Sequence, residues 1–101
     1  MIIFVDIDGT ICINTSGNYN VAMPYFNNIK KVNQLYDEGH TIVYWTARGS
    51  QTKIDWTDLT KKQLHRWGAK YHDLILGKPH YDLYIDDKSI NSMNFFNSDN
   101  K

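Results

Sequence analysis

"MIIFVDIDGT", residues 1–10, is an apolar run that ends abruptly in two aspartates one residue apart. Residues 2–5 are all β-branched or aromatic, which is typical of a strand buried on both faces of a sheet. Such a strand places Asp6 and Asp8 at its carboxyl end. Burying unpaired carboxylates is among the costliest things a fold can do, so the rest of the sequence must supply their partners.

Strand-like and helical patterns alternate along the rest of the chain. Further strands are expected at 41–45, 72–76 and 81–85, and helices at 25–38, at 57–67 and within 88–96. Residues 10–23 are rich in Asn, Ser and Gly and are expected to form a loop or a small hairpin. This alternation predicts an α/β fold, a doubly wound, Rossmann-like parallel sheet of about four strands flanked by helices.

Length and composition indicate one domain over residues 1–101, with 96–101 as a frayed tail. The 11 basic and 11 acidic residues balance, which argues against binding to nucleic acid or to an anionic membrane. The single cysteine, Cys12, has no partner for an internal disulfide. No signal-like start and no membrane-length apolar run is present, so a cytoplasmic location is expected.

Polar residues follow each expected strand at the point where it ends. In chain order they are Asp6 and Asp8, then Thr46 and Arg48, then Gly77, Lys78 and Pro79, then Asp86 and Asp87. The carboxyl ends of parallel strands lie along one edge of the sheet, where ligands bind. If the first strand is central, between the second and the fourth, both aspartate pairs meet there.

Four carboxylates cannot share such a site without cations, because two like charges ~4 Å apart repel by roughly 4 kcal/mol at an effective dielectric of 20. Carboxylate ligands without nearby His or Cys point to Mg²⁺, with Lys78 as a second positive charge and Thr46 as a hydroxyl donor. This set suits a phosphoryl group. One carboxylate can attack phosphorus, and another can protonate the leaving oxygen.

The sequence here resembles the haloacid dehalogenase (HAD) superfamily of phosphatases, through "DIDGT" (6–10), Thr46 in "TARG", Lys78 in "GKP" and "DD" (86–87). The resemblance implies Asp6 as nucleophile and Asp8 as general acid/base, with Thr46 and Lys78 holding the phosphoryl group. It implies magnesium held by Asp6, the backbone carbonyl of Asp8, and Asp86. It implies Asp87 as an alternate contact, or as a partner of a metal ligand.

HAD enzymes usually carry a cap domain, and this chain has no room for one. The resulting open site suits a bulky substrate, or a homo-oligomer in which a neighbour completes the pocket. Arg48 and His80 are candidates for substrate binding, although a salt bridge from Arg48 to a nearby carboxylate is an equal alternative. Further loop candidates near the substrate are Asn14, Ser16, Asn18, Lys53 and Trp56.

The function expected from these residues is a Mg²⁺-dependent phosphomonoesterase acting on a small-molecule phosphate ester. Residues 60–90 are also similar to small HAD phosphatases of capsule or surface-polysaccharide biosynthesis, which implies a sugar phosphate. A nucleotide or polynucleotide end is the alternative substrate. A receiver-type signalling domain uses similar residues, but its phosphorylated aspartate follows the third strand, where this chain has Lys78.

Overall fold

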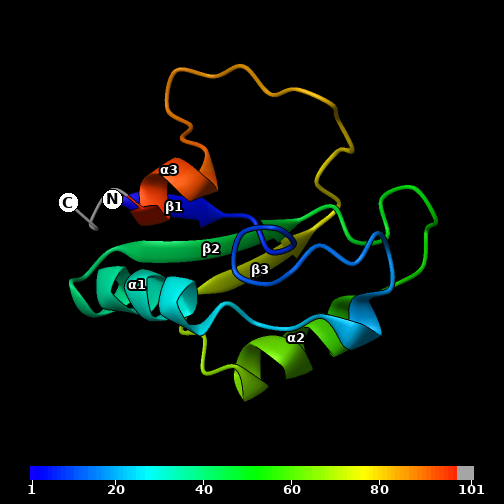
Figure 1. Cartoon of the computed structure of the whole chain (residues 1–101), viewed down its shortest axis with the longest axis horizontal. Coiled ribbons are helices and arrows are strands. Elements are labelled where there is room, and N and C mark those ends of the chain that lie inside the picture. Colours follow the sequence, from blue (N-terminus) through cyan, green and yellow to red (C-terminus); the bar gives the residue numbers. More distant parts are fainter. Residues whose placement is uncertain (98–101) are drawn as a thin grey trace.

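A computed structural model describes residues 1–97 of the chain (Figure 1). Its elements, in chain order, are β1 (Ile2–Val5), η1 (Tyr19–Val21), α1 (Phe26–Asp37), β2 (Thr41–Thr46), α2 (Thr57–Arg66), β3 (Asp73–Leu76) and α3 (Ser92–Asn97). The three strands form one parallel sheet in the order β1-β2-β3. The chain is therefore a small α/β protein with a parallel sheet flanked by helices, compatible with a Rossmann-like fold.

The register of the strands brings their carboxyl ends to one edge. Val5 pairs with Tyr44, and Thr46 pairs with Leu76. The backbone N–H of Lys78 then donates to the carbonyl of Thr46 at 3.1 Å. The residues that follow the three strands consequently meet at the same end of the sheet.

The hydrophobic core lies between the sheet and the helices α1 and α2, which share one face (Figure 1). Ile42 and Tyr44 from β2 pack there with Ile29 and Val32 of α1 and Leu64 of α2. Both crossovers step across the sheet in the same direction, and right-handed crossovers that do so place their helices on the same side.

The opposite face of the sheet is more open. Phe4 is 53% exposed, and Ile75 is 38% exposed. The expectation that β1 is buried on both faces is therefore wrong, because α1 and α2 both cover the other side.

The fourth strand expected at 81–85 is also absent from residues 1–97. Residues 77–91 instead arch away from the sheet as a long connection, coloured yellow to orange in Figure 1. Within this connection Leu83 is 75% exposed and Ile85 is 89% exposed. As a result β1 is an edge strand, and the expected central position for it is wrong.

Chain length explains this difference. Lys78 stands at the carboxyl end of β3, so a parallel strand beyond β1 would have to start at the other end of the sheet. From β3 to a strand position beyond β1 is about 14 Å across the sheet, which is three strand spacings. The return from the carboxyl end of the strands to their amino end adds roughly 20 Å. The three residues from Lys78 to Tyr81 span at most about 11 Å.

The C-terminal helix begins later than the sequence pattern indicates. Residues 96 and 97, expected in a frayed tail, belong to α3, while 98–101 lie outside the described residues. Lys31 anchors α3 to α1 by donating to the carbonyl of Phe95 at 2.9 Å. Ser92 donates to the carbonyl of Gly9 at 3.4 Å.

The segment 10–23 is a folded loop, as expected. Isolated β-bridges join Asp8 to Cys12 and Cys12 to Pro24, and the short helix η1 follows within the loop. Cys12, which takes part in both bridges, is fully buried. Over the described part of the chain, no helix has the length and apolar character needed to span a membrane.

Candidate functional site

A pocket of about 650 Å³ opens at the carboxyl ends of the strands. It brings together six residues predicted from the sequence: Asp6, Asp8, Thr46, Arg48, Lys78 and His80. Three of the loop candidates, Asn14, Ser16 and Trp56, also line it, whereas Asn18 and Lys53 do not. The pocket is therefore built where the alternation of strands and polar clusters predicts it.

Asp6 follows β1 directly and presents its carboxylate to the pocket. Its Oδ1 lies 3.8 Å from Nζ of Lys78, and the Asp6 side chain is 40% exposed. Partial burial raises the pKa of Asp6 above its ordinary value, while the nearby ammonium of Lys78 opposes that rise. The carboxylate of Asp6 is thus accessible from the pocket, and its surroundings only partly balance its negative charge.

Lys78 is held in place by aromatic rings as well as by charge. Its Nζ lies 5.4 Å from the ring centroid of Trp45 and 5.4 Å from that of Tyr81. The Lys78 side chain is only 12% exposed. Ring faces attract a cation, so the two rings restrict the ammonium to the neighbourhood of Asp6.

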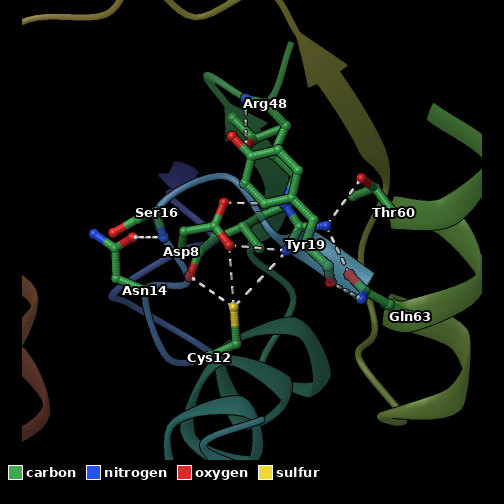
Figure 2. A network of polar contacts seen from close by, with 10 residues as sticks. Asp8, Cys12, Asn14, Ser16, Tyr19, Arg48, Thr60 and Gln63 are labelled. Atoms are coloured by element: carbon green, nitrogen blue, oxygen red, sulfur yellow. Dashed lines mark hydrogen bonds and ion pairs between the residues drawn. The ribbon is translucent and has the colours of Figure 1, made fainter. Parts of the chain in front are cut away.

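Asp8 forms a two-point ion pair with Arg48 (Figure 2). Nε of Arg48 donates to Oδ2 of Asp8, and Nη2 donates to Oδ1, both at 2.9 Å. The fork of the guanidinium matches the carboxylate, which fixes the orientation of Asp8.

The rest of the guanidinium is also engaged. Nη1 of Arg48 donates to Thr60 at 3.1 Å and to Gln63 at 2.6 Å, and the Tyr19 ring lies 4.7 Å from the guanidinium carbon. The Arg48 side chain has no exposed surface. Of the two sequence interpretations of Arg48, the structure shows the salt bridge to Asp8. Arg48 also lines the pocket, and its assignment to substrate binding stays a prediction.

Cys12 completes this buried network from the loop. Its Sγ donates to Oδ1 of Asp8 at 3.5 Å, and Nη2 of Arg48 lies 3.9 Å from the sulfur. Burial, with Asp8 nearby, raises the pKa of Cys12 to about 12. The thiol therefore keeps its proton at neutral pH and can donate it in the hydrogen bond to Asp8.

Thr46 ends β2 and is 1% exposed. Its Oγ1 accepts a hydrogen bond from the backbone N–H of Arg48 at 3.2 Å, which leaves the hydroxyl proton available as a donor. His80 lines the pocket from the start of the long connection and is itself exposed.

Asp86 and Asp87 are not brought to this pocket. Both are exposed on the long connection, where the N–H of Asp87 donates to Oδ1 of Asp86 at 2.8 Å. Across residues 1–97, no three His, Cys, Asp or Glu side chains are grouped closely enough to hold a metal ion. The single chain thus separates the four carboxylates that the sequence pattern predicts together.

Asp6 and the main chain of Asp8 can supply part of a magnesium site. Mg²⁺ is usually held by one or two carboxylates, with water and substrate phosphate completing its coordination. Asp6 has an accessible carboxylate whose raised pKa reflects incomplete compensation of its charge, and the main chain of Asp8 lies two residues on. The side chain of Asp8 is occupied by Arg48 and is not needed as a ligand.

Sequence reasoning missed the residues that surround Arg48, namely Tyr19, Thr60 and Gln63. Gln63 also donates from Nε2 to the carbonyl of Tyr19 at 2.7 Å, which ties α2 to the loop (Figure 2). Tyr19 lies more than forty positions before Thr60 and Gln63, and these two lie 12 and 15 positions after Arg48, so no local spacing links Tyr19, Arg48 and α2.

Comparison with known proteins supports the fold. The crystal structure of an MCSG target from Vibrio cholerae superposes with a TM-score of 0.85 at 26% sequence identity, over 95% of this chain and 88% of that one. That protein is described without an activity. No protein-family model matches the chain, and no curated protein matches it significantly.

Proposed function

We propose that this protein is a capless, HAD-type phosphatase that hydrolyses phosphate monoesters through an aspartyl-phosphate at Asp6. The observation that carries the proposal is the accessible carboxylate of Asp6 beside the ammonium of Lys78, 3.8 Å apart, in a pocket that Thr46 also lines. A nucleophile next to a restrained cation and a hydroxyl donor is the arrangement that phosphoryl transfer needs.

In the first step a carboxylate oxygen of Asp6 attacks phosphorus, and the bond between phosphorus and the ester oxygen breaks. Lys78 and Thr46 hold the non-bridging oxygens. A magnesium ion, held by the Asp6 carboxylate and the Asp8 carbonyl, would supply positive charge to the phosphoryl oxygens. The leaving oxygen takes a proton from Asp8. In the second step Asp8 takes a proton from water, the water oxygen attacks phosphorus, and the bond between phosphorus and Asp6 breaks, which releases phosphate and regenerates Asp6.

Asp8 is the proton carrier in this proposal. Its side chain is 18% exposed, and Oδ2 keeps a lone pair beyond the bond to Arg48, whereas Oδ1 also accepts from the Cys12 thiol. The ion pair holds that carboxylate two residues from the nucleophile, facing the same pocket. Arg48 therefore serves as a positioning residue for Asp8.

The test is hydrolysis of p-nitrophenyl phosphate by the wild type, Asp6→Asn and Asp37→Asn. Asp37 makes a surface ion pair with Lys70 at the C-terminal end of α1 and is a matched control. We expect magnesium-dependent turnover by the wild type and the control, suppressed by a chelator, and none by Asp6→Asn. Turnover by Asp6→Asn at the wild-type rate would refute the mechanism.

A sugar phosphate from surface-polysaccharide synthesis is the proposed substrate, with a nucleotide as the second candidate. The pocket wall contains Tyr19 and Trp56, whose rings pack edge to face at 5.1 Å. Such a wall can receive a nucleobase as well as a sugar ring. The ratio of kcat/KM values for a panel of sugar phosphates and nucleoside monophosphates separates the two.

A further inference from the structure

Within the described residues, one strand edge and one apolar segment of this chain are not covered by other parts of the chain. One is the free edge of β1, which pairs with β2 alone and whose Ile2 is 72% exposed. The other is the segment 81–85, "YDLYI", with Leu83 75% and Ile85 89% exposed. An open strand edge and an exposed apolar segment are each prone to pairing with another chain.

The composition of this segment favours a strand. Residues 81–85 carry Tyr, Leu, Tyr and Ile around one Asp, without Pro or Gly. In an extended conformation Tyr81, Leu83 and Ile85 would share one face. The segment therefore has the side chains of a sheet strand but no sheet of its own to join.

The chain cannot supply its own segment as a parallel neighbour of β1. Lys78 is fixed at the carboxyl end of β3 by its bonds to Thr46 and Asp6. Reaching the start of such a strand would take more than 20 Å, whereas three residues span at most about 11 Å. At the other end, Ser92 is held beside Gly9. A second copy of the chain is free of this limit.

We propose that two copies exchange this segment, so that residues 81–85 of each copy add as a parallel strand to the open edge of β1 in the other. Parallel addition carries Asp86 and Asp87 of one copy to the carboxyl end of the other copy's β1. They then lie beside Asp6, which has one restrained lysine and no second carboxylate free to share a cation. The site is completed by the partner copy.

The exchange also has a physical driving force. It packs Leu83 and Ile85 beside the side chains of β1, which covers part of their exposed surface, and it gives the backbone groups at the edge of β1 hydrogen-bonding partners. A reciprocal arrangement closes as a two-fold dimer and leaves no free β1 edge on which a third chain could build.

The strand exchange itself does not depend on the proposed function, and its first test needs no substrate. Light scattering after size-exclusion chromatography should show a dimer for the wild type. Leu83→Lys together with Ile85→Lys should give a monomer, because two charges would enter the strand interface. Met23→Lys, at an apolar residue that is 63% exposed in a loop elsewhere, should remain dimeric. A monomeric wild type, or a double variant that stays dimeric, overturns the exchange.

The second test asks whether the site is shared, and it rests on the proposed phosphatase activity. Asp6→Asn and Asp86→Asn are each expected to be inactive alone. When the two are unfolded together and refolded, half of the dimers are mixed and each has one intact site, so roughly a quarter of wild-type activity returns.

An active Asp86→Asn protein, or an absence of recovery in the mixture, overturns the shared site. If the wild type itself hydrolyses no phosphate ester, the proposed function fails. The light-scattering result then still decides whether the strands exchange.

Discussion

Arg48 donates two hydrogen bonds of 2.9 Å to the carboxylate of Asp8, which lies forty residues earlier in the chain. The guanidinium is entirely covered, and its remaining donors reach Thr60 and Gln63 of α2. One side chain therefore couples the end of β1, the end of β2 and a helix. The polar end of the sheet is held together by this contact as much as by backbone pairing.

Arg48→Lys should lower the stability of the fold and loosen the position of Asp8 in the site. A lysine keeps one charge but cannot donate to Asp8, Thr60 and Gln63 together, so partly buried acceptors lose their donors. We expect the free energy of unfolding to fall by about 2–3 kcal/mol, measured by urea denaturation. Arg66→Lys, at an exposed position in the last turn of α2, is the matched control and should change little.

Cys12 should make the protein sensitive to alkaline pH. Its pKa rises from an ordinary value of 9.0 to about 12 in the fold, so the folded state holds this proton more tightly than the unfolded chain does. The resulting stability is present below pH 9 and is lost as pH rises from 9 towards 12.

Urea denaturation at a series of pH values measures this effect. Cys12→Ala should flatten the decline between pH 9 and pH 10. Above that range the raised pKa values of Tyr19 and Tyr44 add a loss of their own. A decline that is equally steep in Cys12→Ala would contradict the assignment to the thiol.

The carboxylate of Asp6 should lower the stability of the fold at neutral pH. Burial raises its pKa above 3.8, so protonation of Asp6 stabilises the folded state at acid pH. This stabilisation is lost as pH rises through the pKa of the folded state. Asp6→Asn should therefore be at least as stable as the wild type at pH 7, although it is expected to be inactive. Thermal unfolding at pH 4 and pH 7 checks both the sign and the pH dependence.

Lys78→Met should shift the titration of Asp6 to higher pH. The ammonium of Lys78 is the largest influence that lowers the pKa of Asp6, so its removal leaves desolvation less opposed. Carboxyl ¹³C NMR follows the titration of Asp6 directly. Lys70→Met removes a surface partner of Asp37 and should leave the Asp6 titration where it is in the wild type.

Gly49→Ala should disturb the loop that forms one wall of the pocket. Gly49 adopts a φ of +81°, and an added Cβ would collide with the backbone carbonyl of Ile54. We expect a loss of about 1–3 kcal/mol in the free energy of unfolding. Gly17→Ala is the control: its φ of +99° is also positive, but an added Cβ meets nothing within 4 Å, so its loss should be smaller.

Local patterns predicted the secondary structure well where long apolar stretches or helical spacing were present. The strands β1, β2 and β3 and the helices α1 and α2 are confirmed within one or two residues at either end. The pocket, too, forms where residues follow the strands, because parallel strands send their carboxyl ends to one edge. These features depend on spacing within the chain, which the sequence contains.

The errors concern features that the periodicity of apolar residues does not contain. Residues 81–85 have the composition of a strand, but the short link from Lys78 prevents them from joining β1 of the same chain in parallel. The pattern of apolar residues alone gave no sign of this limit.

The sequence by itself determined the strands, the two long helices and the gathering of Asp6, Asp8, Thr46 and Lys78, because each depends on local periodicity and on the common direction of parallel strands. The tertiary structure alone decided that Arg48 binds Asp8 and that Asp86 stands apart from Asp6. Contacts between distant segments depend on the path and reach of the backbone, which a pattern of residue types does not specify.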